Sequence, residues 1–176
     1  MVRFSRGVGL PEPLPDLLGI AARLDDAAGH GDPFDLLMTT TWSGAVGRHV
    51  LRPTRSFSSG WATTLLPYAG RDGTVHFATR VLTTGIDGLA DVANRAGPAG
   101  SGEPVDVELA WAAGAGPWQR FAAIELTGRL DPDEERDLDL DPFHTSPDLV
   151  PAGLVNRLRR PAYVGSREGR PGGSAP

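Results

Sequence analysis

An arginine and a tyrosine four residues apart are the most direct hint of chemistry in this sequence. Arg159 and Tyr163 stand in the segment RLRRPAY, near the C-terminal end. On a helix, side chains at this spacing lie on one face and within reach of each other. A guanidinium beside a phenol stabilises the phenolate and lowers its pKa from about 10. Pro161 lies between them and removes a helical hydrogen bond, so the contact depends on the helix surviving there.

Other reactive side chains are few. Cysteine is absent, which excludes disulfides, thiol catalysis and zinc or iron–sulfur sites built on cysteine. The acidic segment DPDEERDLDLDP lacks the central glycine of a calcium-binding loop and predicts a solvated turn. No pair of histidines has metal-ligand spacing, and each is expected to be a surface or hydrogen-bonded side chain: His30, His49, His76 and His144.

Composition is typical of a globular domain. The chain has 176 residues, of which 40% are hydrophobic and 22% charged. This length predicts one domain over residues 1–170, with a disordered tail over 171–176. A net charge of −5 argues against a nucleic-acid partner. No apolar run is long enough to span a membrane and no signal peptide is recognisable, so a cytoplasmic location with no membrane partner is expected.

The positions of apolar residues, glycines and prolines predict a mainly β protein with a few short helices. A short helix is expected over 85–97, a C-terminal helix after 151, and a loop or short helix over 55–70. AGAGP is expected to be a hairpin loop. In the strand over 74–82, one face is predicted to hold Val75, Phe77, Thr79 and Val81. Strands are expected over 2–5, 16–25, 33–42, 48–53, 74–82, 102–114 and 116–130.

The N-terminal part of the chain resembles the core of haem catalases. That family shows V-R-F-S, a glycine-containing loop and D-P-R-G-x-A-x-K, then a W-D-L-V-like strand and I-R-D followed by K-F. This sequence has VRFS, then FDLLM and VLRPTRSF in the same order with similar spacing. Between them it matches the second element with Asp16, Gly19, Ala21 and Arg23.

The C-terminal part resembles the catalase segment that closes the haem site. The family has F-N-P, P-G-I-x-P and L-x-x-R-L-F-S-Y, with a threonine and an arginine three and seven residues beyond the tyrosine. The matching residues are Asp141-Pro142, Pro147, Pro151, Arg159, Tyr163, Ser166 and Arg170. The resemblance covers about residues 2–57 and 118–170.

The resemblance implies an antiparallel catalase-like β-barrel and haem as the cofactor. Tyr163 would be the iron ligand and Arg159 its charge partner. Arg3 would pair with a haem propionate, with help from Arg170, and Phe57 would stack on the porphyrin.

Two departures from the family argue against ordinary catalase activity. The distal histidine of catalases lies upstream of V-R-F-S, so the chain is expected to be truncated at its N-terminus relative to the family. Thr40 falls where catalases have a distal asparagine, and a hydroxyl is no substitute for an amide.

Three functions therefore stay open. The first is a haem-binding oxidoreductase that acts on peroxide or an organic hydroperoxide. The second is a haem-free barrel that binds a small apolar ligand or a partner protein, and a homo-oligomer is compatible with either. The third and weakest is a hydrolase such as a phosphodiesterase, the label of some short proteins that resemble this one, although no paired His/Asp metal motif supports it.

Overall fold

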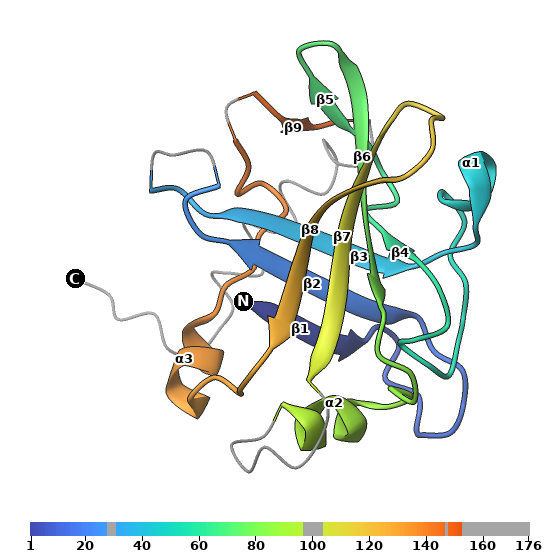
Figure 1. Ribbon diagram of the computed structural model, residues 1–176, viewed down its shortest axis with the longest axis vertical. Coiled ribbons are helices and arrows are strands. Elements are labelled where there is room, and N and C mark those ends of the chain that lie inside the picture. Colours follow the sequence, from blue (N-terminus) through green and yellow to red (C-terminus); the bar gives the residue numbers. More distant parts are fainter. Residues whose placement is uncertain (28–30, 97–103, 147, 153–176) are drawn as a thin grey trace.

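Nine strands form one antiparallel sheet that curls into a half-barrel (Figure 1). The structure is a computed structural model that describes residues 1–27, 31–96, 104–146 and 148–152. The mainly β architecture with few short helices is as predicted from the sequence. The predicted C-terminal helix and tail lie outside the described residues.

The strands follow a meandering path around the half-barrel. β1, β2, β3, β4 and β6 are neighbours in that order, and β7 and β8 continue the sheet beyond β6. β5 pairs with the start of β6 and carries β9 on its other side. The bounds are β1 (Val2–Arg6), β2 (Leu18–Leu24), β3 (Phe34–Thr40), β4 (Ala62–Thr63), β5 (Tyr68–Gly70), β6 (Gly73–Val81), β7 (Val105–Ala113), β8 (Gln119–Leu126) and β9 (Val150–Pro151).

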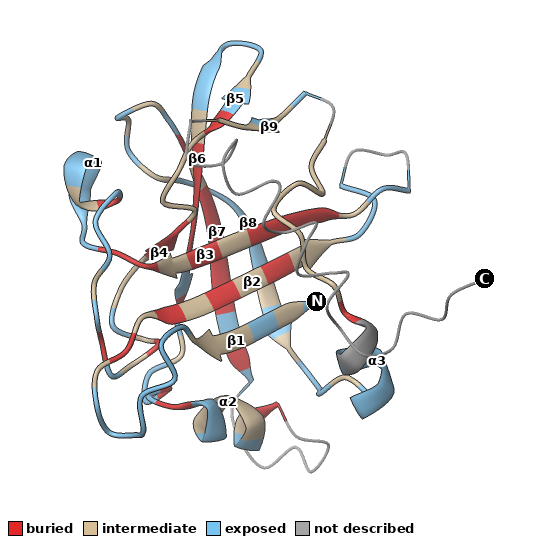
Figure 2. Ribbon diagram, turned by 180° about the vertical axis from the view of Figure 1, so that it is seen from behind, coloured by how far each residue is buried: buried red, intermediate tan, exposed pale blue. Residues whose placement is uncertain are grey.

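The concave side of the sheet holds the core. Leu18, Ile20 and Ala22 alternate along β2 as buried residues, as the period of two predicts. The buried stretches of β2, β3, β6 and β7 face one another (Figure 2). The hairpin loop predicted at AGAGP joins β7 to β8, and Gly114 takes a positive φ of 47° there.

Three short helices lie outside the sheet: α1 (Gly44–Gly47), α2 (Leu89–Arg95) and α3 (Pro132–Asp137). α2 falls inside the predicted helix, whose expected end at Gly97 lies outside the described residues. α3 corrects the expectation of a turn in the acidic segment. Its start is capped because the Asp131 carboxylate accepts the backbone N–H of Asp133 at 2.9 Å, and Pro132 takes the first helical position.

Two further expectations were wrong. Residues 48–53 form no strand, because Val50 and Leu51 are exposed and the chain turns back in a tight loop. In that loop the Trp42 N–H donates to the Val50 carbonyl at 3.0 Å. Conversely, β4 and β5 lie where a loop or short helix was expected, because pairing with β3 and β6 overrides weak local preference.

The middle of β6 is buried on both faces, which the alternating pattern alone did not show. Phe77 and Thr79 face one side as predicted, and His76 on the other side is also buried. The loop that contains α1 supplies the cover, because the His49 ring lies 4.9 Å from the His76 ring, centroid to centroid. A hydrophobic pattern shows which residues share a face, but not what covers that face.

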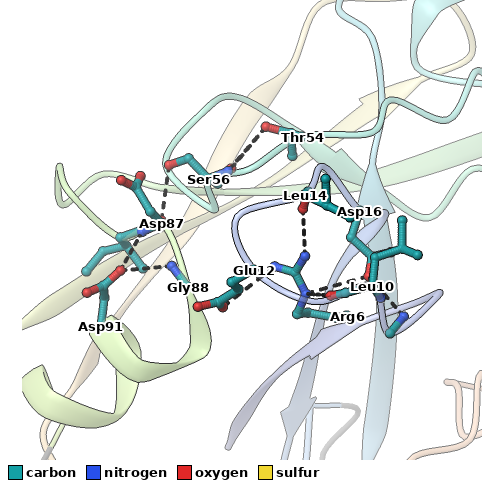
Figure 3. A network of polar contacts seen from close by, with 12 residues as sticks. Arg6, Leu10, Glu12, Leu14, Asp16, Thr54, Ser56, Asp87, Gly88 and Asp91 are labelled. Carbon is teal, nitrogen blue, oxygen red and sulfur yellow. Dashed lines mark hydrogen bonds and ion pairs between the residues drawn. The ribbon is translucent and has the colours of Figure 1, made fainter.

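The carboxylate of Asp16 organises the loop between β1 and β2 (Figure 3). Burial alone would raise the pKa of Asp16, but its backbone N–H donors outweigh burial and lower this pKa below the usual value. Since all four donors are amides of the loop between β1 and β2, the path of the loop is fixed around one charge. The donors, at 2.6–3.0 Å, are the amides of Val8, Gly9, Leu10 and Leu17.

The same loop also contacts the segment around Thr54 and the start of α2. Asp16 and Thr54 exchange two backbone hydrogen bonds of 2.9 Å. Arg6 pairs with Glu12 at 3.7 Å between Nη1 and Oε1. The Glu12 carboxylate lies against Gly88, where a Cβ would come within 2.5 Å of Oε1, and Gly88 precedes the first residue of α2. The loop thereby sets the position of β1 relative to α2 (Figure 3).

No helix among the described residues is long and apolar enough to cross a membrane.

Candidate functional site

Three of the residues predicted to serve a haem lie in the described part of the chain, and they do not line one cavity: Arg3, Thr40 and Phe57. Thr40 is buried, and its hydroxyl donates to the Arg52 carbonyl at 2.9 Å and accepts the Leu18 N–H at 3.2 Å. The hydroxyl has a single donor, and that donor is already used. A role for Thr40 in place of the distal asparagine would require this bond to break.

Phe57 is a core residue in this structure. It is only 1% exposed, and its ring packs edge to face against Phe4 with the centroids 5.0 Å apart. A porphyrin could stack on Phe57 only if neighbouring side chains moved. Such a move would open a well-packed core, which is costly.

Arg3 is placed differently, because it lies on the edge strand β1 with an exposed side chain. Its side chain makes no hydrogen bond or ion pair with any residue that the structure describes. Arg159, Tyr163 and Arg170 lie outside the described residues, so their predicted roles stay predictions. Of the three haem residues that the structure describes, Thr40 and Phe57 are engaged elsewhere, and Arg3 lines the cleft described next.

A cleft of about 400 Å³ opens along the seam of the half-barrel. In the described part of the chain, β1 pairs only with β2 and β8 only with β7, so these two strands are the edges of the main sheet path. Residues of both strands, of α2 and of the segment around α3 line the cleft, and Figure 1 shows where these elements lie. Its apolar lining comes mainly from Val2, Phe4, Leu89, Val92, Ile124 and Leu126.

The cleft combines an apolar floor with a charged rim. Most of the floor residues also pack against the main core, so the floor continues the protein interior to the surface. The rim carries the side chains of Arg3, Glu125, Arg129 and Glu135. Among the described residues, the side chains of these four have no hydrogen-bond or ion-pair partner, so their charged groups are available to a ligand.

A second polar cluster joins β2, β3 and the segment after α3. Arg23 binds the Asp35 carboxylate with both ends of its guanidinium, at 2.7 Å from Nε and 2.6 Å from Nη2. His144 Nδ1 lies 3.0 Å from Asp35 Oδ2, and the Asp141 N–H donates to the same oxygen at 2.9 Å. Burial alone would raise the pKa of Asp35, but these partners, Arg23 foremost, lower it below the usual value.

This cluster brings an aspartate and a histidine together, as the catalytic site of a hydrolase does. Asp35 orients His144 through Nδ1, so Nε2 is the ring nitrogen that remains for a catalytic contact. Among the described residues, no serine or threonine hydroxyl forms a hydrogen bond with that nitrogen. The bidentate Arg23 contact and the backbone bonds indicate that the cluster fastens the segment after α3 to the sheet. Sequence spacing missed it because Asp35 and His144 are 109 residues apart.

A third cluster gathers tryptophan, arginine and histidine on the outer face of β4 and β6. The Trp61 and Trp118 rings lie 5.7 Å apart, centroid to centroid. Arg80 stacks on Trp61 at 4.8 Å and Arg48 on Trp118 at 4.4 Å. Beside this stack, burial lowers the pKa of His76 to about 4, helped by the charges of His49 and Arg48. The described residues contain no group of three or more His, Cys, Asp or Glu side chains that could hold a metal ion.

Comparisons with known proteins add no relative, because no family model, curated protein or solved structure matches the chain.

Replacing Asp35 with asparagine tests the fastening role of its cluster. The Asp35→Asn substitution keeps the shape of the side chain but leaves the Arg23 guanidinium without its carboxylate partner. Losing one partner of a buried ion pair costs about 3–5 kcal/mol. We expect urea denaturation to show a fall in the free energy of unfolding of about that size. Asp106→Asn is the control, because that carboxylate is exposed without a partner among the described residues, and a similar fall there would contradict the assignment.

Acid should destabilise the fold through His76. The folded pKa of about 4 lies below the unfolded value of 6.5, so in this range the unfolded chain binds a proton that the folded chain does not. Stability is therefore expected to fall as the pH falls from 6.5 towards 4. Urea denaturation across this range should show a smaller fall for His76→Gln. His49→Gln removes only a secondary cause and should keep most of the fall, and an unchanged profile in His76→Gln would refute the explanation.

Proposed function

We propose that the protein binds a small, mainly apolar ligand with an acidic head group in the cleft between β1 and β8. The proposal rests on one observation: an apolar floor continuous with the core opens at the seam beside an exposed arginine, Arg3, that has no partner in the described residues. Binding sites for small molecules are typically concave and apolar with a few polar groups that orient the ligand.

The physical driving force is burial of apolar surface. A ligand tail that covers Val92 and Ile124 removes apolar area from water, worth roughly 25 cal/mol per Å². The cleft volume of about 400 Å³ suits a molecule the size of a medium-chain fatty acid. A carboxylate at the rim would meet the guanidinium of Arg3, whereas Glu125 and Glu135 disfavour a head group with several negative charges.

Filling the cleft should abolish binding. Val92 lies on α2 and lines the cleft, so Val92→Trp would occupy the space of the ligand tail. We expect the affinity for the fluorescent probe anilinonaphthalene sulfonate to fall at least about tenfold, because roughly 1.4 kcal/mol of apolar burial corresponds to that factor. An unchanged melting temperature would show that α2 still folds, and undiminished probe binding by the folded variant would overturn the proposal.

Arg3 should recognise the acidic head group of the ligand. Arg3→Gln is expected to weaken displacement of the probe by decanoate about threefold to tenfold, in line with a charge-assisted hydrogen bond. Displacement by decanol should not change, since decanol has the same tail and no charge. Arg120→Gln is the control, because Arg120 is exposed on β8 but does not line the cleft. Equal effects on decanoate and decanol would show that Arg3 does not recognise the acid.

Haem binding is a second candidate, favoured by the position of Arg3 at the rim, where a propionate could meet it. Tyr163 would be the iron ligand by resemblance, and when bound the haem would supply the redox chemistry for a hydroperoxide. Haemin titration should then give a Soret band that changes in Tyr163→Phe and weakens in Arg3→Gln. If decanoate displaces haemin and Tyr163→Phe leaves the Soret band unchanged, haemin is instead only an apolar occupant of the cleft.

A further inference from the structure

Charge is unevenly distributed along this acidic chain. Residues 36–71 and 109–124 contain no aspartate or glutamate, although the chain has 22 acidic residues and a net charge of −5. The same two segments carry five arginines and all four tryptophans. A surface built from these segments has no negative side chain of its own, although Arg48 among its arginines is buried.

The structure joins the two segments at one corner of the half-barrel. Arg48, just after α1, donates to the carbonyl oxygens of Gly116 at 2.8 Å and Gly114 at 3.3 Å in the β7–β8 hairpin. The stacked Trp61 and Trp118 rings join the same segments a second time. Figure 1 shows α1 and this hairpin on the same side of the molecule. We call this region the α1 corner, made of residues 41–52, 61–67 and 112–118.

The α1 corner exposes apolar side chains on a well-defined protrusion. Val46 is 79% exposed and Trp42 54%, and Val50 and Leu51 beside them are also exposed. The loop is closed by hydrogen bonds of Trp42 N–H to Val50 and of Val50 N–H to Gly47. Gly47 lies so close to Trp42 that a Cβ would come within 2.9 Å of its backbone. The exposed apolar side chains therefore belong to a folded loop, and Figure 2 shows α1 of this loop mainly in the colour of exposed residues.

We propose that the α1 corner docks on an anionic lipid surface, with Trp42, Val46 and Val50 entering the interfacial region. Tryptophan is favoured at the boundary between head groups and hydrocarbon, and basic residues near an anionic leaflet are attracted to it. Arg52 is half-exposed with its guanidinium 6.0 Å from the Trp42 ring, so it lies near the head groups. Glu108, at the border of the corner, is buried and paired with Arg80 at 3.3 Å.

Single-stranded nucleic acid is the main rival occupant, because it also binds arginine and aromatic rings. Two observations favour lipid. Trp61 and Trp118 are stacked on each other and on arginines, which occupies the faces that bases would need. The most exposed large apolar side chain of the corner is an aliphatic valine, which offers a base nothing to stack on. Docking of this kind needs no spanning segment, so the absence of a spanning run from the sequence has no bearing on it.

Vesicle flotation tests the proposal with the full chain. Vesicles of equal parts phosphatidylglycerol and phosphatidylcholine should carry the protein, and phosphatidylcholine alone should not. Added salt should weaken the binding. Val46→Asp should lower the partition coefficient at least about tenfold, because it removes an inserted apolar group and adds a repelled charge. Val8→Asp is the matched control, since Val8 is 63% exposed in the β1–β2 loop, outside the corner.

The results of these experiments distinguish a lipid surface from nucleic acid as the occupant of the α1 corner. The fluorescence of Trp42 should shift to shorter wavelength on anionic vesicles, and Trp42→Phe should remove that shift. Both valine variants replace exposed side chains, so their melting temperatures should match the parent chain. Failure to float with anionic vesicles, or equal loss in Val46→Asp and Val8→Asp, would overturn the proposal. Single-stranded DNA bound in preference to vesicles, with no effect of Val46→Asp, would overturn it in favour of nucleic acid. None of these results depends on the β1–β8 cleft.

Discussion

The buried carboxylate of Asp16 is the interaction on which the arrangement of the cleft depends. It collects backbone N–H groups from the loop between β1 and β2, and its own backbone pairs with Thr54. Through Arg6 and Glu12 the same loop meets the start of α2. An edge strand held only by its single neighbour would be free to shift. The Asp16 loop ties β1 at its end, and thereby fixes one wall of the cleft relative to α2.

The motif that suggested a catalase has a structural explanation at nearly every position. Asp16 organises the loop, and Gly19 faces Ser5, whose Oγ would lie 2.5 Å from any Cβ at that position. Arg23 holds the buried Asp35 carboxylate. Residues of these types in this order are therefore explained by the contacts that hold β1, β2 and β3 together. This explanation requires neither a scaffold nor a cofactor shared with catalases.

Local patterns were enough to predict the main strands, because burial alternates along β2 and glycine-rich turns separate the segments. They did not predict β4 and β5, which exist only through pairing with β3 and β6. Of the site residues, Arg3 was singled out by resemblance, but its place at the seam depends on β1 being an edge. Val92 and Ile124, which form the floor, have ordinary apolar roles in their own segments. Only the curl of the sheet brings them together.

The charges at the seam have a simpler explanation that competes with ligand binding. An exposed sheet edge invites pairing with another chain, and charged side chains on edge strands prevent it. Arg3 on β1 and Glu125 on β8 are suitably placed for that role. The two explanations differ in what they require of the floor. Edge protection needs no apolar cleft beneath the charges, whereas the floor here leaves Leu89 exposed and opens a space that neither edge fills. A protecting charge would act on self-association, while a ligand-binding charge would act on affinity without changing the size of the protein.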